Sequence, residues 1–182
     1  DTIAFGGTIT GNLVFEGSSD DSHELTLSPG NPTGAIYKEQ ELIDLSKILL
    51  KNPHVQILSD DIYEHIIYGE PFFNIINVEP KLYKRTFIVN GVSKAFSMTG
   101  WRIGYAAGNS EVISAMNNLS GQSTSNPTSI SQKAAIEAFS GNQSKVEEML
   151  GEFEIRKEYI SSFLNEIEGI ECFVPKGAFY VF

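Results

Sequence analysis

The chain has 182 residues, 41% of them hydrophobic, so it is long enough to bury a sizeable core. Its net charge of −10 and pI near 4.7 argue against nucleic acid or an anionic membrane as partner, because no basic surface can displace counterions. Its single cysteine, Cys172, excludes an internal disulfide and indicates a core residue in a reducing compartment. Without a signal-peptide pattern or a bilayer-length apolar run, we expect a globular, cytoplasmic protein.

The first part of the chain has the weakest pattern. Residues 1–23 combine glycines with a Ser/Asp patch and lack Lys and Arg, so we expect a loop-rich segment with a short strand at residues 12–15. From residue 24 the pattern becomes regular, with a strand at 24–28, ELTLS, followed by the turn SPGNPTG. The next segment, EQELIDLSKILLK at 39–51, is predicted to be a helix because its leucines recur on one face.

Strands and helices alternate through the rest of the chain. We predict strands at VQILS, RTFIVN and RIGYAAG, then a helix from Ser110 to about Leu119 with Val112, Met116 and Leu119 facing inward. Asn126-Pro127 predicts the start of another helix, and a long charged helix is expected over residues 143–168. This alternation predicts an α/β fold, a mainly parallel sheet with helices on both faces.

Four polar side chains follow predicted strands. Asn31 comes after ELTLS, Asp60 after VQILS with Tyr63 one turn beyond it, and Lys94 after RTFIVN. Each alone has an ordinary structural explanation, as a cap, a turn residue, a core phenol or a surface lysine. Because ligands of open α/β sheets bind beyond the carboxyl ends of the strands, the four together predict a site, with Arg102 eight residues after the lysine.

These side chains point to a particular cofactor chemistry. A lysine among small and apolar residues has its charged form disfavoured by desolvation, so its amine can attack a carbonyl and form an imine. The fork of donors on Arg102 suits a phosphate, with nearby glycines letting backbone amides approach the same anion. A buried carboxylate such as Asp60 needs a cationic partner, and a protonated pyridine nitrogen is one. Aldehyde, phosphate and pyridinium together describe pyridoxal 5'-phosphate.

Three motifs in this order resemble a known family. NPTG at 31–34, SDDIY at 59–63 and VSKAFSMTGWRIGYAAG at 92–108 are similar to the fold type I pyridoxal-phosphate aminotransferases of class I/II. QSTSNPTSISQ at 122–132 further resembles the bacterial aspartate aminotransferase branch. The lysine motif is highly specific, SDDIY is moderately so, and NPTG alone is weak.

The resemblance implies a role for each candidate residue. Lys94 would bond the cofactor and move the proton between the substrate carbon and the cofactor, while Asp60 would keep the pyridine nitrogen protonated. Tyr63 and Asn31 would hydrogen-bond the ring's phenolic oxygen, with Asn31 also near the substrate carboxylate. Arg102 would bind the phosphate. The implied reaction is transamination between an amino acid and a 2-oxo acid, aspartate with 2-oxoglutarate, in a homodimer of the full-length enzyme.

The chain departs from the family in two respects. Relatives often carry a phosphate-binding serine three residues before the lysine, where this chain has Gly91, and Ser93 is the candidate to replace it. The segments of relatives that carry the glycine-rich phosphate loop and the carboxylate-binding arginine are not identifiable. We therefore expect residues 24–168 to be the central part of a cofactor-binding large domain and residues 169–182 the start of a truncated small domain. The isolated chain is expected to be inactive and to leave apolar surface exposed.

Two alternatives remain open at this stage. A sister enzyme of the same fold could act on alanine, aromatic amino acids or kynurenine, or be an aminocyclopropane-carboxylate synthase. The chain could also be a non-catalytic fragment that binds cofactor or a partner chain. A nucleotide loop is not supported because the G-x-x-x-x-G-K-[ST] pattern is missing. No metal is expected, since His23, His54 and His65 lack ligand spacing.

Overall fold

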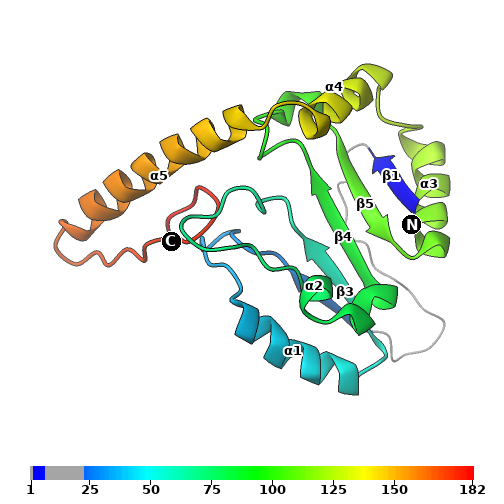
Figure 1. The fold of residues 1–182 in the computed structure, drawn as a ribbon, viewed down its shortest axis with the longest axis horizontal. Helices are drawn as coiled ribbons and strands as arrows, with labels where there is room; N and C mark the ends of the chain where they lie inside the picture. Colours follow the sequence, from blue (N-terminus) through cyan, green and yellow to red (C-terminus); the bar gives the residue numbers. More distant parts are fainter. Residues whose placement is uncertain (1, 7–22) are drawn as a thin grey trace.

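The computed structural model describes residues 2–6 and 23–182. Within these residues, five strands form one sheet in the spatial order β1-β5-β4-β3-β2 (Figure 1). The predicted strand at 12–15 lies outside the described residues. The strands are β1 (Thr2–Gly6), β2 (His23–Leu27), β3 (Val55–Asp60), β4 (Thr86–Gly91) and β5 (Gly104–Gly108).

The sheet is mixed. β2, β3 and β4 are parallel, with Leu27 beside Ser59 and Asp60 beside Val89, whereas β5 runs antiparallel to both β4 and β1. The parallel part agrees with the sequence prediction, but the expectation of a mainly parallel sheet was wrong for β5. Parallel neighbours need a long crossover connection, usually a helix. Residues 92–103, which join β4 to β5, contain only the short 3₁₀ helix η2 (Thr99–Trp101), and the chain simply turns back.

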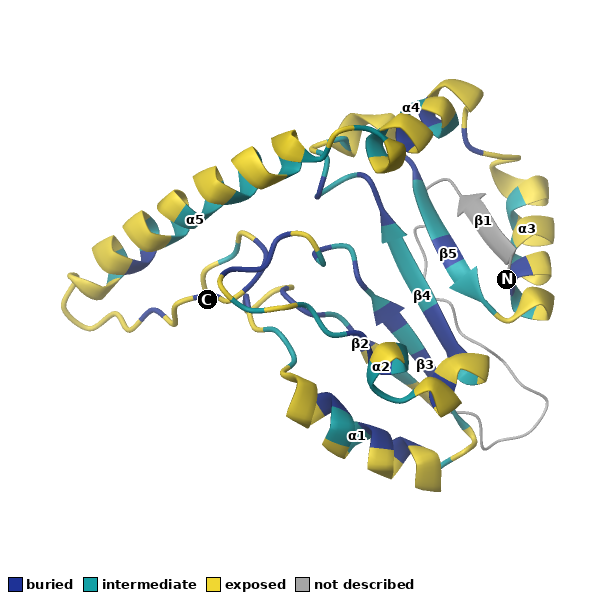
Figure 2. Cartoon of the chain, in the orientation of Figure 1, coloured by how far each residue is buried: buried dark blue, intermediate teal, exposed yellow. Residues whose placement is uncertain are grey.

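The main core lies between β2, β3 and α1 (Glu39–Lys51). The helix has the predicted bounds, and it buries Leu42 and Leu49 against Leu27 and Ile57, with Leu45 half-buried. Its apolar residues recur at intervals of three and four, so they share the face that meets the sheet (Figure 2). Two short elements close this core, α2 (Ile75–Val78) and the 3₁₀ helix η1 (Pro80–Arg85), through Ile75 and Leu82.

The C-terminal half contributes three helices, α3 (Ser110–Ser123), α4 (Ser129–Ser140) and α5 (Ser144–Asn165). α3 packs against β1 and β5. Its buried residue is Ile113, while Val112 and Met116 are half-buried and Leu119 is 67% exposed, so the predicted inward face was wrong at Leu119. α4 begins two residues after Pro127, with Thr128 at the N-cap position, and α5 lies within the predicted long charged helix.

α5 extends away from the sheet (Figure 1), and most of its surface is exposed (Figure 2). Large apolar side chains remain on it, including Ile155, Tyr159 and Phe163, each at least half exposed. The expectation that apolar surface is left uncovered is therefore confirmed for this helix.

Beyond α5 the chain returns to the loops that follow the strands. Lys176 N and Gly177 N both donate to Gly34 O, at 2.8 and 2.9 Å, and Ala178 N donates to Ile66 O at 2.8 Å. The last residues thus form part of the strand-end packing. With this mixed sheet and its packed helices, the chain has the predicted α/β fold.

Candidate functional site

The centre of the site is a carboxyl and an amine from neighbouring strand ends. Asp60 is the last residue of β3, and Lys94 follows the end of β4 by three residues. Burial raises the pKa of the Asp60 carboxyl, while a hydrogen bond from Ile62 N at 3.3 Å and the charge of Lys94 oppose the rise. The parallel pairing of β3 with β4 brings these two groups to one edge of the sheet.

Aromatic rings surround the amine. Lys94 Nζ lies 5.6 Å from the ring centre of Tyr63 and 5.4 Å from that of Phe179, within reach of cation–π attraction. The hydroxyls of Tyr63 and Tyr180 are hydrogen-bonded at 2.5 Å. Burial raises the pKa of Tyr63, and the bond to Tyr180 acts in the same direction, so Tyr63 keeps its proton at neutral pH. The phenol is thus available as a hydrogen-bond donor or acceptor beside the amine.

The NPTG turn lies next to Tyr63. Gly34 N donates to Gly30 O at 3.0 Å and Gly30 N to Ala35 O at 2.7 Å, which folds the turn on itself. Gly30 is packed between Tyr63 and Ala178, so closely that an added Cβ would lie 2.9 Å from Ala178 Cβ. Asn31, the next residue, is exposed and joined to Pro32 by a cis peptide bond. The turn therefore places Asn31 at the border of the site.

The loop that carries Lys94 also carries Arg102, and its two ends meet. Gly91 and Gly104 are paired where β4 and β5 join, and a Cβ on Gly91 would lie 3.0 Å from Gly104 Cα. These glycines allow two backbones to pack closely, which also leaves little room for the serine that relatives often carry at position 91. Gly100 differs, because an added Cβ there would meet nothing within 4 Å.

Arg102 ends the 3₁₀ helix η2 in a left-handed conformation, with φ of 48°. Its side chain is exposed, and NH1 donates to Thr99 O at 2.7 Å. The Lys94–Arg102 loop thus presents both cations at the strand-end edge. Ser93 is half-buried beside the lysine.

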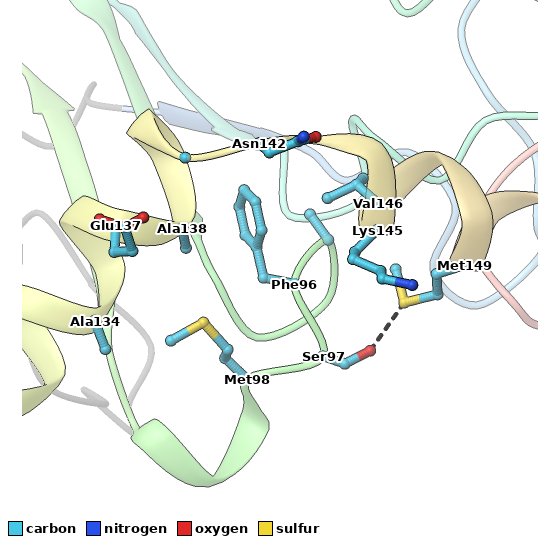
Figure 3. Close-up of a pocket in the computed structure, with 12 residues that line it drawn as sticks. Phe96, Ser97, Met98, Ala134, Glu137, Ala138, Asn142, Lys145, Val146 and Met149 are labelled. Carbon is cyan, nitrogen blue, oxygen red and sulfur yellow. Dashed lines mark hydrogen bonds between the residues drawn. The ribbon is translucent and has the colours of Figure 1, made fainter.

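A cavity borders this loop at residues 95–98 (Figure 3). This cavity, of about 560 Å³, separates residues 95–98 from the α4–α5 junction, with Phe96, Met98 and Ala138 among its apolar lining residues. Ser97 has a left-handed φ of 53°, and its Oγ donates to Met149 Sδ of α5 at 2.9 Å. This contact fixes the loop three residues beyond Lys94.

The structure brings together three of the predicted site residues, Asp60, Tyr63 and Lys94. Asn31 follows Gly30, which packs on Tyr63. Sequence reasoning missed Phe179 and Tyr180, which contact Lys94 and Tyr63 from 85 or more positions further along the chain. No local pattern reports such a contact, although the aromatic pair in GAFYVF was a visible signal. It also missed Asp61, the neighbour of Asp60, which is almost fully buried.

Among the described residues, no group of three or more His, Cys, Asp or Glu side chains could hold a metal ion. No described helix has both the length and the apolar composition to cross a membrane. Cys172 is a free, buried thiol, as predicted.

The fold and the site define an α/β protein with an amine, a carboxyl and a phenol at its strand ends. Residues 25–182 match the family described as aminotransferase class I and II. The chain belongs to the class I and II aminotransferase family.

Named relatives agree with this assignment. The chain is 53% identical over 156 residues to a probable aspartate/prephenate aminotransferase of Rhizobium leguminosarum bv. phaseoli, covering 85% of this chain and 39% of the relative. It is 51% identical over the same length to the aspartate/prephenate aminotransferase of Cereibacter sphaeroides, again covering 39% of that protein. The chain therefore spans about two fifths of the length of these relatives.

Solved structures show the same fold. The crystal structure of the aspartate aminotransferase from Rhizobium meliloti superposes with a TM-score of 0.86 at 45% identity, covering 90% of this chain and 41% of that chain. The aspartate aminotransferase from Thermus thermophilus with maleate superposes with a TM-score of 0.77 at 38% identity, covering 87% and 41%.

Proposed function

We propose that this chain is the cofactor-binding part of a pyridoxal-phosphate-dependent aminotransferase that acts on aspartate and 2-oxoglutarate. The observation that carries the proposal is the convergence of Lys94, Asp60 and Tyr63 at the ends of β3 and β4. The family assignment supports the cofactor, because class I and II aminotransferases are generally pyridoxal-phosphate-dependent.

The side chains present fit this cofactor. The Asp60 carboxyl is half-buried with a raised pKa, and its described hydrogen-bond donor is the backbone of Ile62, so a cationic N–H would find a ready acceptor there. Tyr63 and Asn31 offer polar groups for a ring oxygen. Arg102, near the end of the loop that carries Lys94, offers a guanidinium fork for a phosphate.

In this proposal each side chain has one task. When bound, the cofactor supplies a ring that accepts electrons during amino-group transfer. Lys94 Nζ would hold the cofactor through its aldehyde; once the substrate's amino group has displaced it, the freed amine would take the proton from the substrate carbon and pass it to the cofactor. Asp60 would keep a proton on the pyridine nitrogen. Arg102 would anchor the phosphate so that Lys94 and the substrate stay aligned.

The aromatic side chains near the C-terminus would border the same amine. Phe179 lies 5.4 Å from Lys94 Nζ, and Tyr180 is hydrogen-bonded to Tyr63.

The test is a coupled assay on the parent full-length chain with aspartate and 2-oxoglutarate. We expect turnover at ordinary enzyme rates, about 1 to 1,000 per second, and its loss in Lys94→Ala. Lys84→Ala, which changes an exposed lysine of η1, serves as the control and should retain the rate. An active Lys94→Ala variant would contradict the proposal.

The names of the relatives favour a second acceptor. Because two relatives above 50% identity are named aspartate/prephenate aminotransferases, prephenate should be assayed in place of 2-oxoglutarate. Turnover with both acceptors would widen the proposed specificity, and turnover with prephenate alone would replace 2-oxoglutarate. The alanine, aromatic and kynurenine aminotransferase alternatives predict turnover with those amino donors instead of aspartate.

We extend the proposal to a cytoplasmic homodimer. The free, buried Cys172 supports a reducing compartment. Exposed apolar side chains on α4 and α5 offer surface for packing against further protein, among them Ile130 at 70% exposure. Light scattering on the full-length protein tests the dimer, and a monomer at micromolar concentration would contradict it.

A further inference from the structure

Asp60 ends β3 and Asp61 follows it directly, but the two side chains have different surroundings. Asp60 is half-buried near Lys94, whereas Asp61 is only 3% exposed and lies among Ser59 and Asn74. Successive side chains of an extended chain point to opposite faces, so the orientation of one residue constrains the next. Asp61 has no part in the proposed cofactor site, and a buried carboxyl without a function would be costly.

Every polar atom of Asp61 is bonded. Its Oδ1 accepts from Ser59 Oγ at 2.7 Å, and its Oδ2 accepts from Asn74 Nδ2. Its backbone N donates to Val89 O of β4 at 3.0 Å, and its carbonyl accepts from Glu64 N at 2.9 Å. Asp61 therefore links β3, β4 and the start of the following turn.

Asn74 connects this network to the main core. Its Oδ1 accepts from Ile76 N at 2.9 Å, which caps α2, and the adjacent Ile75 is buried in the core beneath α1. The second partner of Asp61 is thus itself held by rigid packing. By contrast, the described side-chain hydrogen bond of Asp60 is the one it accepts from Ile62 N at 3.3 Å. A bond of this length is weak, so by itself it does little to hold the Asp60 carboxyl in one orientation.

We propose that Asp61 is a positioning residue that fixes the backbone at the end of β3 so that the Asp60 carboxyl faces Lys94. The inference rests on the proposed function, because it assigns Asp60 to the cofactor. Asp61 acts through Asp60 and the local backbone, without touching cofactor or substrate.

The charge state of Asp61 suits this role at neutral pH. Burial raises its pKa to about 6, hydrogen bonds from Ser59 and Asn74 oppose the rise, and the charges of Glu64 and Asp60 add to it. Above pH 6 the ionised carboxylate can therefore accept both hydrogen bonds at once.

The test compares three variants of the parent full-length chain. Asp61→Ala removes both acceptors, whereas Asp61→Asn keeps the shape and can accept from Asn74 while donating to Ser59 Oγ. Thr86→Val is the matched control. It removes another buried hydrogen bond, from Thr86 Oγ1 to Leu82 O at 2.9 Å, at the opposite end of the neighbouring strand β4.

Two readouts are needed besides activity. The first is the dissociation constant of pyridoxal 5'-phosphate from the cofactor-free protein, and the second is the pH midpoint of the bound cofactor's absorbance band. Asp61→Ala should weaken cofactor binding about 10- to 100-fold and shift the midpoint, because it displaces Asp60. Asp61→Asn should stay within about threefold. Thr86→Val should lower the melting temperature without changing either readout.

The outcomes separate this inference from the proposed function. If the unsubstituted protein does not bind the cofactor, the proposed function fails, and the inference with it. If it binds, and Asp61→Ala binds equally well with the same midpoint, only the positioning role is overturned. The role is also overturned if Thr86→Val weakens binding as much as Asp61→Ala does. Should Asp61→Ala not fold, Ser59→Ala tests the same role, and an unchanged midpoint and affinity in that variant overturn it.

Discussion

The core beneath α1 and the strand-end edge that holds the site differ in the contacts that build them. Leu42, Ile57 and Leu82 of the core are at most 1% exposed and come from one continuous segment, residues 42–82. The edge contains half-buried polar groups such as Asp60 and Lys94, and it joins segments as distant as Tyr63 and Tyr180 through their hydrogen bond. Stability and chemistry are therefore assigned to different parts of the molecule, and substitutions should affect one without the other.

The largest effect is expected in the core. Leu42→Ala leaves a cavity between α1 and the sheet and should lower the free energy of unfolding by about 2 to 5 kcal/mol. Leu119→Ala, at an exposed leucine of α3, should change it by less than about 0.5 kcal/mol. Denaturant unfolding measures both. A small effect of Leu42→Ala on stability would contradict the separation of stability from cofactor binding. A changed cofactor affinity in the molecules that remain folded would contradict it as well.

At the edge, Arg102→Ala should reduce cofactor affinity by about 2 to 4 kcal/mol, because a bidentate charged contact to the phosphate is lost. Arg102→Lys should recover only part of this, since a point charge cannot replace the fork. Unfolding free energy of the cofactor-free protein should hardly change, because Arg102 is exposed. Equal cofactor titrations for all three proteins would place Arg102 outside the site.

Asp61 lies between the two regions and should make stability depend on pH. Its pKa is raised by burial from 3.8 to about 6, so between these values the folded chain keeps a proton that the unfolded chain releases. Stability therefore falls as pH rises from about 4 to 6, by up to about 3 kcal/mol. Urea unfolding at several pH values should show this slope reduced in Asp61→Asn. Parallel stability curves for the two proteins would contradict the raised pKa.

The smallest effect on the free energy of unfolding is expected where Pro175, near the C-terminus, packs on the NPTG turn. Gly34 and Gly69 share a φ of 71°, but a Cβ at Gly34 would overlap Pro175 Cβ, whereas one at Gly69 would meet nothing within 4 Å. Both alanine variants incur the same backbone strain, so their difference in unfolding free energy isolates the contact. We expect Gly34→Ala to be about 1 to 3 kcal/mol less stable than Gly69→Ala. Equal thermal shifts would show that the segment does not pack on the turn.

The sequence predicted the parts of the molecule that depend on local pattern. Leucine spacing defined α1, and short apolar runs located β2, β3 and β4 and so placed Asp60 and Lys94 at their ends. It could not predict β1, because residues 2–6 carry little strand pattern of their own and pair with β5 from the other end of the sheet. It also missed the reversed direction of β5, although a connection without a long helix was a usable clue.

Contacts over long separations escaped prediction for a different reason. Tyr180 and Tyr63 are 117 residues apart, and the burial of Asp61 depends on Asn74 from a separate loop. Leu119 followed a helical repeat, yet α3 turns Ile113 toward the sheet instead. A repeat defines a face of a helix, but only tertiary packing decides which face is covered.

The central claim, that Lys94 at the strand-end edge holds the cofactor, can be tested directly by reductive labelling. The full-length protein is incubated with pyridoxal 5'-phosphate, reduced with borohydride and digested, and the modified peptide is identified by mass. We expect one dominant label, on the peptide containing Lys94, and loss of that label in Lys94→Ala. A label spread over other lysines, with Lys94 unmodified, would contradict the claim.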